Sequence, residues 1–499
     1  MAKSLKEKTI SGFIYKLMER AGALGFHFLV SIVLARLLVP KEFGIVALVV
    51  VLVSILDVFV TYGFGNSLIA DKNSDALDFS TCFYFGLALS LVVYAGVFAA
   101  APFAGTYFKD PLLPPVLRVM ALRIPIAAVN SVQHAFVSKH MMFRKFFIST
   151  SIGTVLSGIA AIAMAYRGFG VWALVVQYLG NVVCDTVCLW IIVGWRPQWA
   201  FSWARLRKIY DYGWKILAVG LLDAVYSRLR RLVIAKKFSS EDLAYYNNGN
   251  LFPTTSMNLL EPTINTVLFP ALAQCNDNQT AMRGMTRRMI GFSTYLVFPV
   301  MIGLAVIAKP LVLLILTEKW LPCIIFLQIG CLAYMLRPLQ FINMCVIKAS
   351  GRSGLLLKLD VLKKGVGLLL LVWSVRHGVV GVALSAVAVN LFSTVVNIAP
   401  NRRILDYGYG LQFWDVAHSA ILALLMGAGM FALSFCPLSP FFLLCIQCGF
   451  GLTFYIGGSI LFKNDNFSYA LSLGRQLLQK KRMGQKAGRN SPAVTKDDA

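Results

Sequence analysis

The sequence has few charged side chains and very few acids. Charged residues make up 14% of the 499 residues, and 22 acids stand against 47 basic residues. Hydrophobic residues reach 58%, and the mean hydropathy is +0.71. A water-soluble domain of this length cannot bury so much apolar surface in its core. The composition therefore excludes a water-soluble protein and indicates a membrane protein.

Motifs for nucleotide hydrolysis and metal catalysis are missing. No Gly-x-x-x-x-Gly-Lys-Ser/Thr phosphate loop occurs, which excludes nucleotide hydrolysis by that route. The five histidines lack a metal-ligand spacing such as His-Glu-x-x-His, so we expect no metal and no other cofactor. No loop predicted on the external side is long enough to hold a catalytic domain. We therefore expect a transporter without catalytic residues.

Apolar windows of roughly 20 residues, the length that spans about 30 Å of hydrocarbon, recur along the whole chain. We count about fourteen of them, which predicts an all-α polytopic membrane protein. No cleavable signal is apparent, because the first span carries Lys16, Glu19 and Arg20. Lys and Arg stay on the cytoplasmic side during insertion, and their distribution places both termini in the cytoplasm. One loop disagrees, since Asp71 to Asp78 is predicted inside but has three acids and only one lysine.

A short passage occurs twice, 200 positions apart. Ile32 to Ile45 (IVLARLLVPKEFGI) aligns without a gap on Leu232 to Tyr245 (LVIAKKFSSEDLAY). The duplication predicts two six-helix lobes, related by an axis along the membrane normal, that rock to expose a site alternately to each side. The predicted divisions are a lobe at 1–195, a basic and Trp-rich interfacial linker at 196–212, a second lobe at 213–400, two further transmembrane helices at 401–465 and a basic cytoplasmic tail at 466–499.

Ionisable residues inside the predicted spans are the candidate functional residues. A Lys or Arg at mid-bilayer costs roughly 2.5 to 3.5 kcal/mol, so these residues must line water, pair with an acid or reach a surface. The cationic candidates are Lys16 and Arg20 in the first span, Arg123 in the fourth (114–137), Arg230 and Arg231 in the seventh (213–235) and Arg337 in the tenth (321–347). Two alternatives stay open: the first pair could snorkel to the cytoplasmic end, and the seventh-span pair could lie at the outer mouth.

Polar residues and acids share some of these spans. The polar candidates are Asn130 and His134 on the Arg123 face of the fourth span, and Asn250, Thr254 and Asn258 in the eighth (243–270). They could line a pathway or only form interhelical hydrogen bonds. Asp223 and Glu261 are candidates for coupling transport to an ion, although Glu261 could equally form a structural pair with an arginine. The excess of cations favours an anionic cargo, because guanidinium groups bind phosphate oxygens, and we expect no nucleic acid partner.

Three segments carry a resemblance to a known family. They are Ala35 to Ile69 (ARLLVPKEFGIVALVVVLVSILDVFVTYGFGNSLI), Ile234 to Leu272 with its Ala-Tyr-Tyr and Leu-Phe-Pro-Ala-Leu elements, and Val346 to Lys364 (VIKASGRSGLLLKLDVLKK). These resemble the Wzx-type lipopolysaccharide and capsular polysaccharide flippases, in the colanic-acid-exporter-like branch of the multidrug/oligosaccharidyl-lipid/polysaccharide exporter superfamily.

The resemblance implies a fourteen-helix carrier in the bacterial inner membrane. Such a carrier moves an undecaprenyl-diphosphate-linked oligosaccharide from the cytoplasmic to the periplasmic leaflet, uses basic cavity residues for the diphosphate, and has a polysaccharide polymerase and export machinery as further partners. One feature departs from the family, because Arg230 stands where relatives commonly have an acid and Ala235 replaces a glycine. Coupling through that position is therefore in doubt.

Three alternatives stay open at this point. A small-molecule antiporter of the same superfamily would need acids and aromatic residues, instead of cations, to dominate its pocket. A membrane-embedded polysaccharide polymerase or transferase would need a long external loop. A flippase for lipid-linked peptidoglycan precursors would share the diphosphate chemistry.

Overall fold

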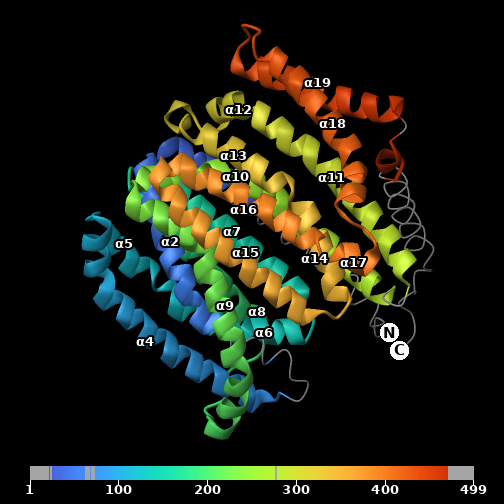
Figure 1. Ribbon diagram of the computed structural model, residues 1–499. Coiled ribbons are helices and arrows are strands. Elements are labelled where there is room, and N and C mark those ends of the chain that lie inside the picture. Colours follow the sequence, from blue (N-terminus) through green and yellow to red (C-terminus); the bar gives the residue numbers. More distant parts are fainter. Residues whose placement is uncertain are drawn as a thin grey trace, which may run out of the picture. The chain divides into compact units, whose positions relative to one another are not determined.

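The computed structural model describes residues 22, 25–61, 68, 74–275, 278–462 and 464–469, and within α9 and α10 it describes the backbone but not every side chain. All regular elements in these ranges are helices (Figure 1). The described chain falls into two compact units. The first comprises Met1–Leu251, Val312–Phe326 and Leu368–Ser385, and the second Phe252–Leu311, Leu327–Gly367 and Ala386–Ala499. The predicted lobe boundaries are not tested by these units and stay a prediction.

The first unit contains the helix Gly25–Leu37, α2 (Pro40–Thr61), α4 (Ala76–Phe108), α5 (Leu113–Met120), α6 (Arg123–Lys139), α7 (Phe143–Tyr166), α8 (Val171–Ile192) and α9 (Trp203–Lys237), with the short helices η1 (Glu318–Trp320) and η2 (Val375–His377). The second unit contains α11 (Gln279–Val306), α14 (Arg337–Ala349), α17 (Asn401–Leu405), α18 (Tyr409–Leu433) and α19 (Pro440–Leu461). The helices α10 (Ser240–Gln274), α12 (Ala308–Ile315), α13 (Cys323–Met335), α15 (Ser353–Ser374) and α16 (Gly378–Ile398) contribute to both units.

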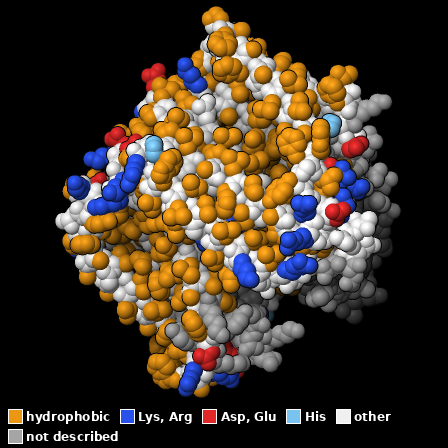
Figure 2. Space-filling model, in the orientation of Figure 1, with side chains coloured by type: hydrophobic (Ala, Val, Ile, Leu, Met, Phe, Trp, Pro, Cys, Tyr) orange, Lys and Arg blue, Asp and Glu red, His pale blue; other side chains and the backbone are white. Residues whose placement is uncertain are grey.

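The described residues include 10 helical stretches long and apolar enough to cross a membrane, compared with about fourteen expected. Three features account for the difference. The helices α9 and α10 are long but too polar to qualify, Gly25–Leu37 is short, and 353–405 counts once although it contains both α15 and α16. Hydrophobic side chains are spread over the whole face that Figure 2 shows. Large exposed ones include Val92 on α4, Ile191 on α8 and Leu461 on α19, at 69%, 75% and 77% exposure. Such a surface suits lipid and not water.

The repeated passage has the same local structure in both copies. The first copy ends one helix at Leu37 and begins α2 at Pro40, and the second ends α9 at Lys237 and begins α10 at Ser240. Each new helix is capped in the same way. The backbone N–H of Val39 donates to the Glu42 carboxylate at 3.1 Å, and that of Ser239 donates to Asp242 at 3.2 Å. The two copies therefore share a helix end, a short turn and an acidic side chain that accepts from the backbone before the next helix.

The acidic loop that disagreed with the charge rule is neutralised by the basic segment after α8. Arg205, near the start of α9, donates to both oxygens of Asp78 at 3.0 and 3.1 Å and pairs with Asp75 at 3.2 Å. The hydrogen bond from the Asp78 backbone N–H holds the pKa of Asp75 below its ordinary value, and the charge of Arg205 adds to this effect. Asp75 and Asp78 thus lie beside the start of α9 in the first unit.

The helix α9 begins ten residues before the predicted seventh span. The linker was expected to reach residue 212, but the helix starts at Trp203, where the Ser202 side chain accepts from the backbone N–H of Arg205. An N-terminal cap of this kind satisfies a backbone donor that the helix itself leaves free. The part of the linker that stays non-helical still exposes Trp199 almost completely, at 98%.

Candidate functional site

The predicted fourth span is two helices instead of one, and Arg123 is the first residue of the second. The chain leaves α5 at Met120 and begins α6 at Arg123, with Pro125 in the first turn. Proline has no N–H to donate to the preceding turn and fits only near a helix start. No side chain caps this helix start. Ala121 and Leu122 keep a right-handed helical backbone, and the N–H groups of Ile124 and Ile126 donate to the carbonyls of Ala121 and Leu122. The span therefore bends at Arg123.

Arg123 forms an ion pair that the sequence did not indicate. Its Nε donates to Oδ2 of Asp57, from α2, at 3.0 Å, and the side chains are 38% and 13% exposed. The other oxygen of Asp57 is buried without a hydrogen-bond partner among the described residues. Of the Arg123 nitrogens, Nε alone has a described hydrogen-bond partner, which leaves the terminal pair for an anion.

A second arginine reaches the same part of α2. Arg228, on α9, donates through Nε to the hydroxyl of Ser54, one turn before Asp57, and through Nη1 to the carbonyl of Ala224 at 3.3 Å. Arg228 is not among the cationic candidates that the sequence indicated. Sequence reasoning also overlooked Asp57, although a lone acid inside an apolar span carries the same desolvation cost as the cations that were selected.

The other seventh-span candidates do not gather into one cluster. Arg230 donates to the Ser385 hydroxyl on α16 at 3.4 Å, and its Nε is buried without a partner among the described residues. Arg231 and Asp223 are exposed on α9. Arg230 and Arg231 point about 100° apart on α9, so they do not share one contact.

The tenth span repeats the pattern of the fourth within the second unit. The chain leaves α13 at Met335 and begins α14 at Arg337, with Pro338 next and no side-chain cap. Nη2 of Arg337 lies 4.0 Å from Oε2 of Glu261, and the guanidinium carbon lies 5.7 Å from the Tyr334 ring centroid. The Arg337 side chain is 40% exposed, while its Nε is buried without a described partner. Glu261 thus has an arginine at the outer distance of an ion pair, and its role in coupling stays a prediction.

Asn130 and His134 converge on an acid that sequence reasoning missed. Nδ2 of Asn130 donates to Oδ2 of Asp185, on α8, at 2.7 Å, and Nε2 of His134 lies 3.3 Å from the same oxygen. The hydroxyl of Thr150, on α7, donates to the other oxygen at 3.4 Å. Asp185 is 12% exposed. It is the one acid of α8, which is the signal that could have identified it.

The polar residues of α10 are not equally buried. Asn250 is half-buried and donates to the carbonyl of Tyr246 at 2.8 Å, Thr254 is half-buried, and Asn258 is exposed. The predicted residues Lys16 and Arg20 lie outside the described part of the chain.

Each unit therefore contains an arginine at the start of an interrupted helix. Discontinuous membrane helices are typical of transporter binding sites, because half-helix N-termini attract anionic groups of the substrate. A partly exposed guanidinium group at such a bend can bind phosphate or carboxylate oxygens with paired hydrogen bonds. The arrangement is suited to anion binding, and together with the 10 membrane-spanning stretches of the described chain it indicates a multi-pass membrane transport protein.

Comparison with known proteins identifies the family. Residues 33–325 match the family described as "Polysaccharide biosynthesis protein", and the chain belongs to that family. It is 24% identical over 402 residues to the lipopolysaccharide biosynthesis protein WzxC of Escherichia coli (strain K12), covering 79% of this chain and 81% of that protein. It is also 24% identical over 321 residues to the succinoglycan biosynthesis transport protein ExoT of Rhizobium meliloti (strain 1021), covering 64% of this chain and 65% of ExoT.

A solved structure shows the same fold. The lipid II flippase MurJ, in an inward closed conformation, superposes with a TM-score of 0.72 at 12% identity, covering 91% of this chain and 99% of MurJ. The predicted resemblance to Wzx-type flippases is confirmed, and the family is one of transporters. The alternative of a membrane-embedded polymerase or transferase is therefore wrong.

Proposed function

We propose that this protein is a flippase for an undecaprenyl-diphosphate-linked oligosaccharide. It moves this lipid from the cytoplasmic to the periplasmic leaflet of a bacterial inner membrane, for export of a cell-surface polysaccharide. Transport proceeds by alternating access through a cationic cavity in a fourteen-helix, two-lobed carrier with both termini in the cytoplasm. A polysaccharide polymerase and export machinery receive the product.

The observation that carries the proposal is the matched position of Arg123 and Arg337. Each lies at the point where a predicted span bends, in the fourth and the tenth span, and each keeps more than a third of its side chain exposed. A diphosphate carries several oxygens, so it can accept paired, charge-assisted hydrogen bonds from a guanidinium group. An uncharged cargo would gain nothing from these groups, which would then only cost desolvation energy.

Reconstitution tests the proposal. Purified protein is placed in liposomes with a fluorescently labelled undecaprenyl-diphosphate oligosaccharide, and arrival of the label in the opposite leaflet is followed. Wild type is compared with Arg123→Gln, Arg337→Gln and the matched control Arg283→Gln, whose arginine pairs with exposed Asp406. We expect each test variant to lower the initial rate by about tenfold or more and the control to change it by less than about twofold.

The outcomes separate the cargo from the residues. Transport by wild type and by both test variants at equal rates would remove the arginines from the mechanism. Transport of a lipid-linked peptidoglycan precursor, but of no polysaccharide intermediate, would reassign the cargo. Arg123→Lys and Arg337→Lys, which keep the charge but lose the planar fork, should transport at intermediate rates.

One observation favours a second function, a cation-coupled antiporter for small molecules. Asp185 is an acid inside a span, and three side chains from two other helices surround it. Intramembrane carboxylates of this kind often bind protons or metal cations during transport. Uptake of cationic dyes driven by a proton gradient, without transport of lipid-linked oligosaccharide, would favour this function.

A further inference from the structure

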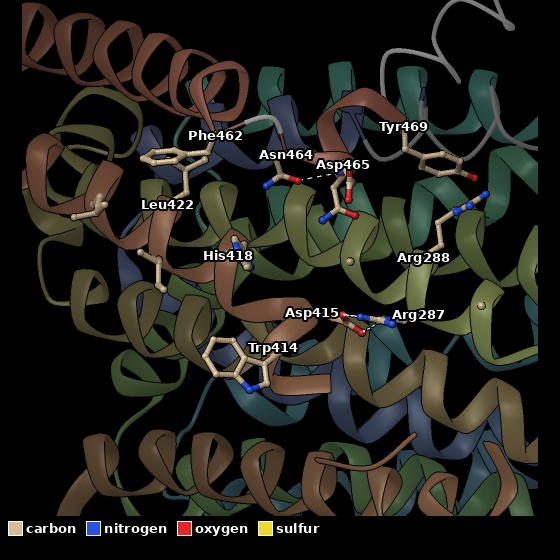
Figure 3. Close-up of a pocket in the computed structure, with 15 residues that line it drawn as sticks. Arg287, Arg288, Trp414, Asp415, His418, Leu422, Phe462, Asn464, Asp465 and Tyr469 are labelled. Atoms are coloured by element: carbon tan, nitrogen blue, oxygen red, sulfur yellow. Dashed lines mark hydrogen bonds and ion pairs between the residues drawn. The ribbon is translucent and has the colours of Figure 1, made fainter. Parts of the chain in front are cut away.

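A cavity of about 1200 Å³ lies within the second unit, outside the sites described above. It is lined by the start of α11, the first half of α18 and the residues that follow α19 (Figure 3). Pockets for drug-sized ligands usually have volumes of about 300 to 1,000 Å³, so this cavity suits a larger ligand. None of the residues predicted from the sequence as site residues lines it.

The cavity has an apolar part. Ile421, Leu422 and Leu425 on α18 and Phe462 after α19 contribute large aliphatic or aromatic side chains. The same helices expose Leu424 at 60% and Leu461 at 77% on their surfaces. This part of the cavity can therefore take up a hydrocarbon chain from the surrounding lipid, because transfer between two apolar environments has little solvation cost.

One of the two cavity arginines is already neutralised. Arg287 forms a bidentate ion pair with Asp415 (Figure 3). The Nε–Oδ2 and Nη2–Oδ1 distances are both 2.7 Å. The Tyr407 hydroxyl donates to the same carboxylate at 2.7 Å. This arrangement holds Asp415 in a fixed position and leaves little positive charge at Arg287 for a ligand.

The adjacent arginine keeps its charge available. Arg288 is exposed, and its guanidinium carbon lies 5.5 Å from the ring centroid of Tyr469. Within the described ranges it has no carboxylate partner, although Asp465 also lines the cavity. A cation held over an aromatic ring keeps its N–H donors for an anion.

Two amides complete the polar part of the cavity. Asn464 uses its carbonyl oxygen to accept the backbone N–H of Asn466 at 2.9 Å, which leaves its NH₂ group for another acceptor. The Asn466 amide packs against Gly291 on α11, and a Cβ at Gly291 would lie 2.7 Å from its oxygen. The missing side chain at 291 thus lets the residues after α19 approach α11 and build one wall of the cavity.

We propose that this cavity binds an anionic phospholipid of the surrounding membrane. The phosphodiester accepts hydrogen bonds from Arg288 and the asparagine amides, and an acyl chain lies along Leu422, Leu425 and Phe462. One available guanidinium matches the single negative charge of a phosphodiester better than the higher charge of a diphosphate. The apolar part excludes free phosphate as the natural ligand. The site is therefore distinct from the proposed cargo site and does not depend on it.

Lipid binding to the full-length protein in detergent tests this proposal directly. Native mass spectrometry measures retention of phosphatidylglycerol and of phosphatidylcholine by wild type, by Arg288→Gln and by the matched control Arg283→Gln, five residues earlier on the same helix. We expect wild type and the control to retain phosphatidylglycerol preferentially. We expect Arg288→Gln to bind it about tenfold more weakly, because a charge-assisted hydrogen bond is lost. Gly291→Ala should also weaken binding without changing any charge.

Several results would overturn the proposal. Equal retention of both lipids by wild type would show that the phosphodiester charge is not recognised. Unchanged phosphatidylglycerol binding in Arg288→Gln, with an unchanged melting temperature, would move the site elsewhere. Competition by glycerol phosphate alone would make the ligand a soluble phosphate, and preferential retention of undecaprenyl diphosphate would make the cavity part of the cargo route.

Discussion

At the scale of residues, the arginines inside the membrane depend on partners that lie far away in the sequence. Arg123 contacts Asp57, 66 residues earlier, and Asn130 contacts Asp185, 55 residues later. Removing one member of a buried pair leaves an uncompensated charge, whereas removing both leaves none. The pairs therefore limit which substitutions are informative, since a single neutralisation changes stability and binding together.

The Asp57 and Arg123 pair should behave as a coupled unit. We expect Asp57→Asn alone to destabilise the protein by about 1 to 2 kcal/mol, less than for a fully buried pair because Arg123 is partly exposed. Arg123→Gln added to Asp57→Asn should restore the melting temperature in detergent without restoring transport. Additive losses in the double-mutant cycle would show that the two residues stabilise the protein independently.

The Asp185 cluster should lose stability in proportion to the strength of each contact. Asp185→Asn removes the negative charge and replaces one of the two acceptor oxygens with an NH₂ donor, and it should cost about 1 to 3 kcal/mol. Asn130→Leu should cost less, and Thr150→Val least, because the Thr150 contact is long at 3.4 Å. Thermal unfolding of the three variants gives this order, and an equal effect of all three would contradict the geometry.

At the scale of elements, two breaks and two caps position these residues. Pro125 and Pro338 lie in the first turns of α6 and α14. These two helices therefore begin inside the membrane-spanning stretches Leu113–Lys139 and Cys323–Ala349. The caps at Glu42 and Asp242 begin α2 and α10 at equivalent places of the repeat. Within the first unit these two helix starts touch, because Gly44 lies against the backbone of Ser240.

Gly44→Ala should disturb this contact. A Cβ at Gly44 would overlap the carbonyl oxygen of Ser240, and backbone atoms cannot rotate away as a side chain would. We expect a loss of about 1 to 3 kcal/mol, the usual cost of overpacking. Gly96→Ala on α4 is the matched control, since no atom lies within 4 Å of its added Cβ, and it should be neutral or slightly stabilising. Equal melting temperatures for both variants would mean that the two helix starts are not in contact in the membrane.

At the scale of the whole molecule, the membrane sidedness stays a prediction that native cysteines can test. Cys436 is exposed in the turn between α18 and α19, which the predicted topology places outside the cell membrane. Cys445 and Cys448 are exposed too, but they lie within α19, where hydrocarbon prevents formation of the reactive thiolate.

A membrane-impermeant maleimide added to spheroplasts should therefore label wild type at Cys436. Cys436→Ser should abolish this labelling, and Cys275, at the end of α10, should react only after permeabilisation. Labelling of Cys436 only after permeabilisation would invert the topology or change the number of spans. The measurement is a gel-shift or mass spectrum of the labelled protein.

The sequence by itself determined the class of protein, because hydropathy is a local property that a window of about 20 residues reports completely. It also determined the family and the repeat at Val39 and Ser239, since both are read from the order of residues. It located Arg123 and Arg337 as unusual residues through their desolvation cost alone. It did not place the helix breaks, although Pro125 and Pro338 were visible, because proline both interrupts helices and begins them.

Only the tertiary structure decided which charges are matched. Asp57, Asp185 and Glu261 receive their partners from other helices, and no local pattern encodes a distance between helices. The sequence could not distinguish Arg287 from Arg288 for the same reason. The two are adjacent, but Arg287 pairs with Asp415 whereas Arg288 lies over the Tyr469 ring. Local sequence sets how costly a buried charge is, and packing between helices sets whether that cost is compensated by a partner or left for a ligand.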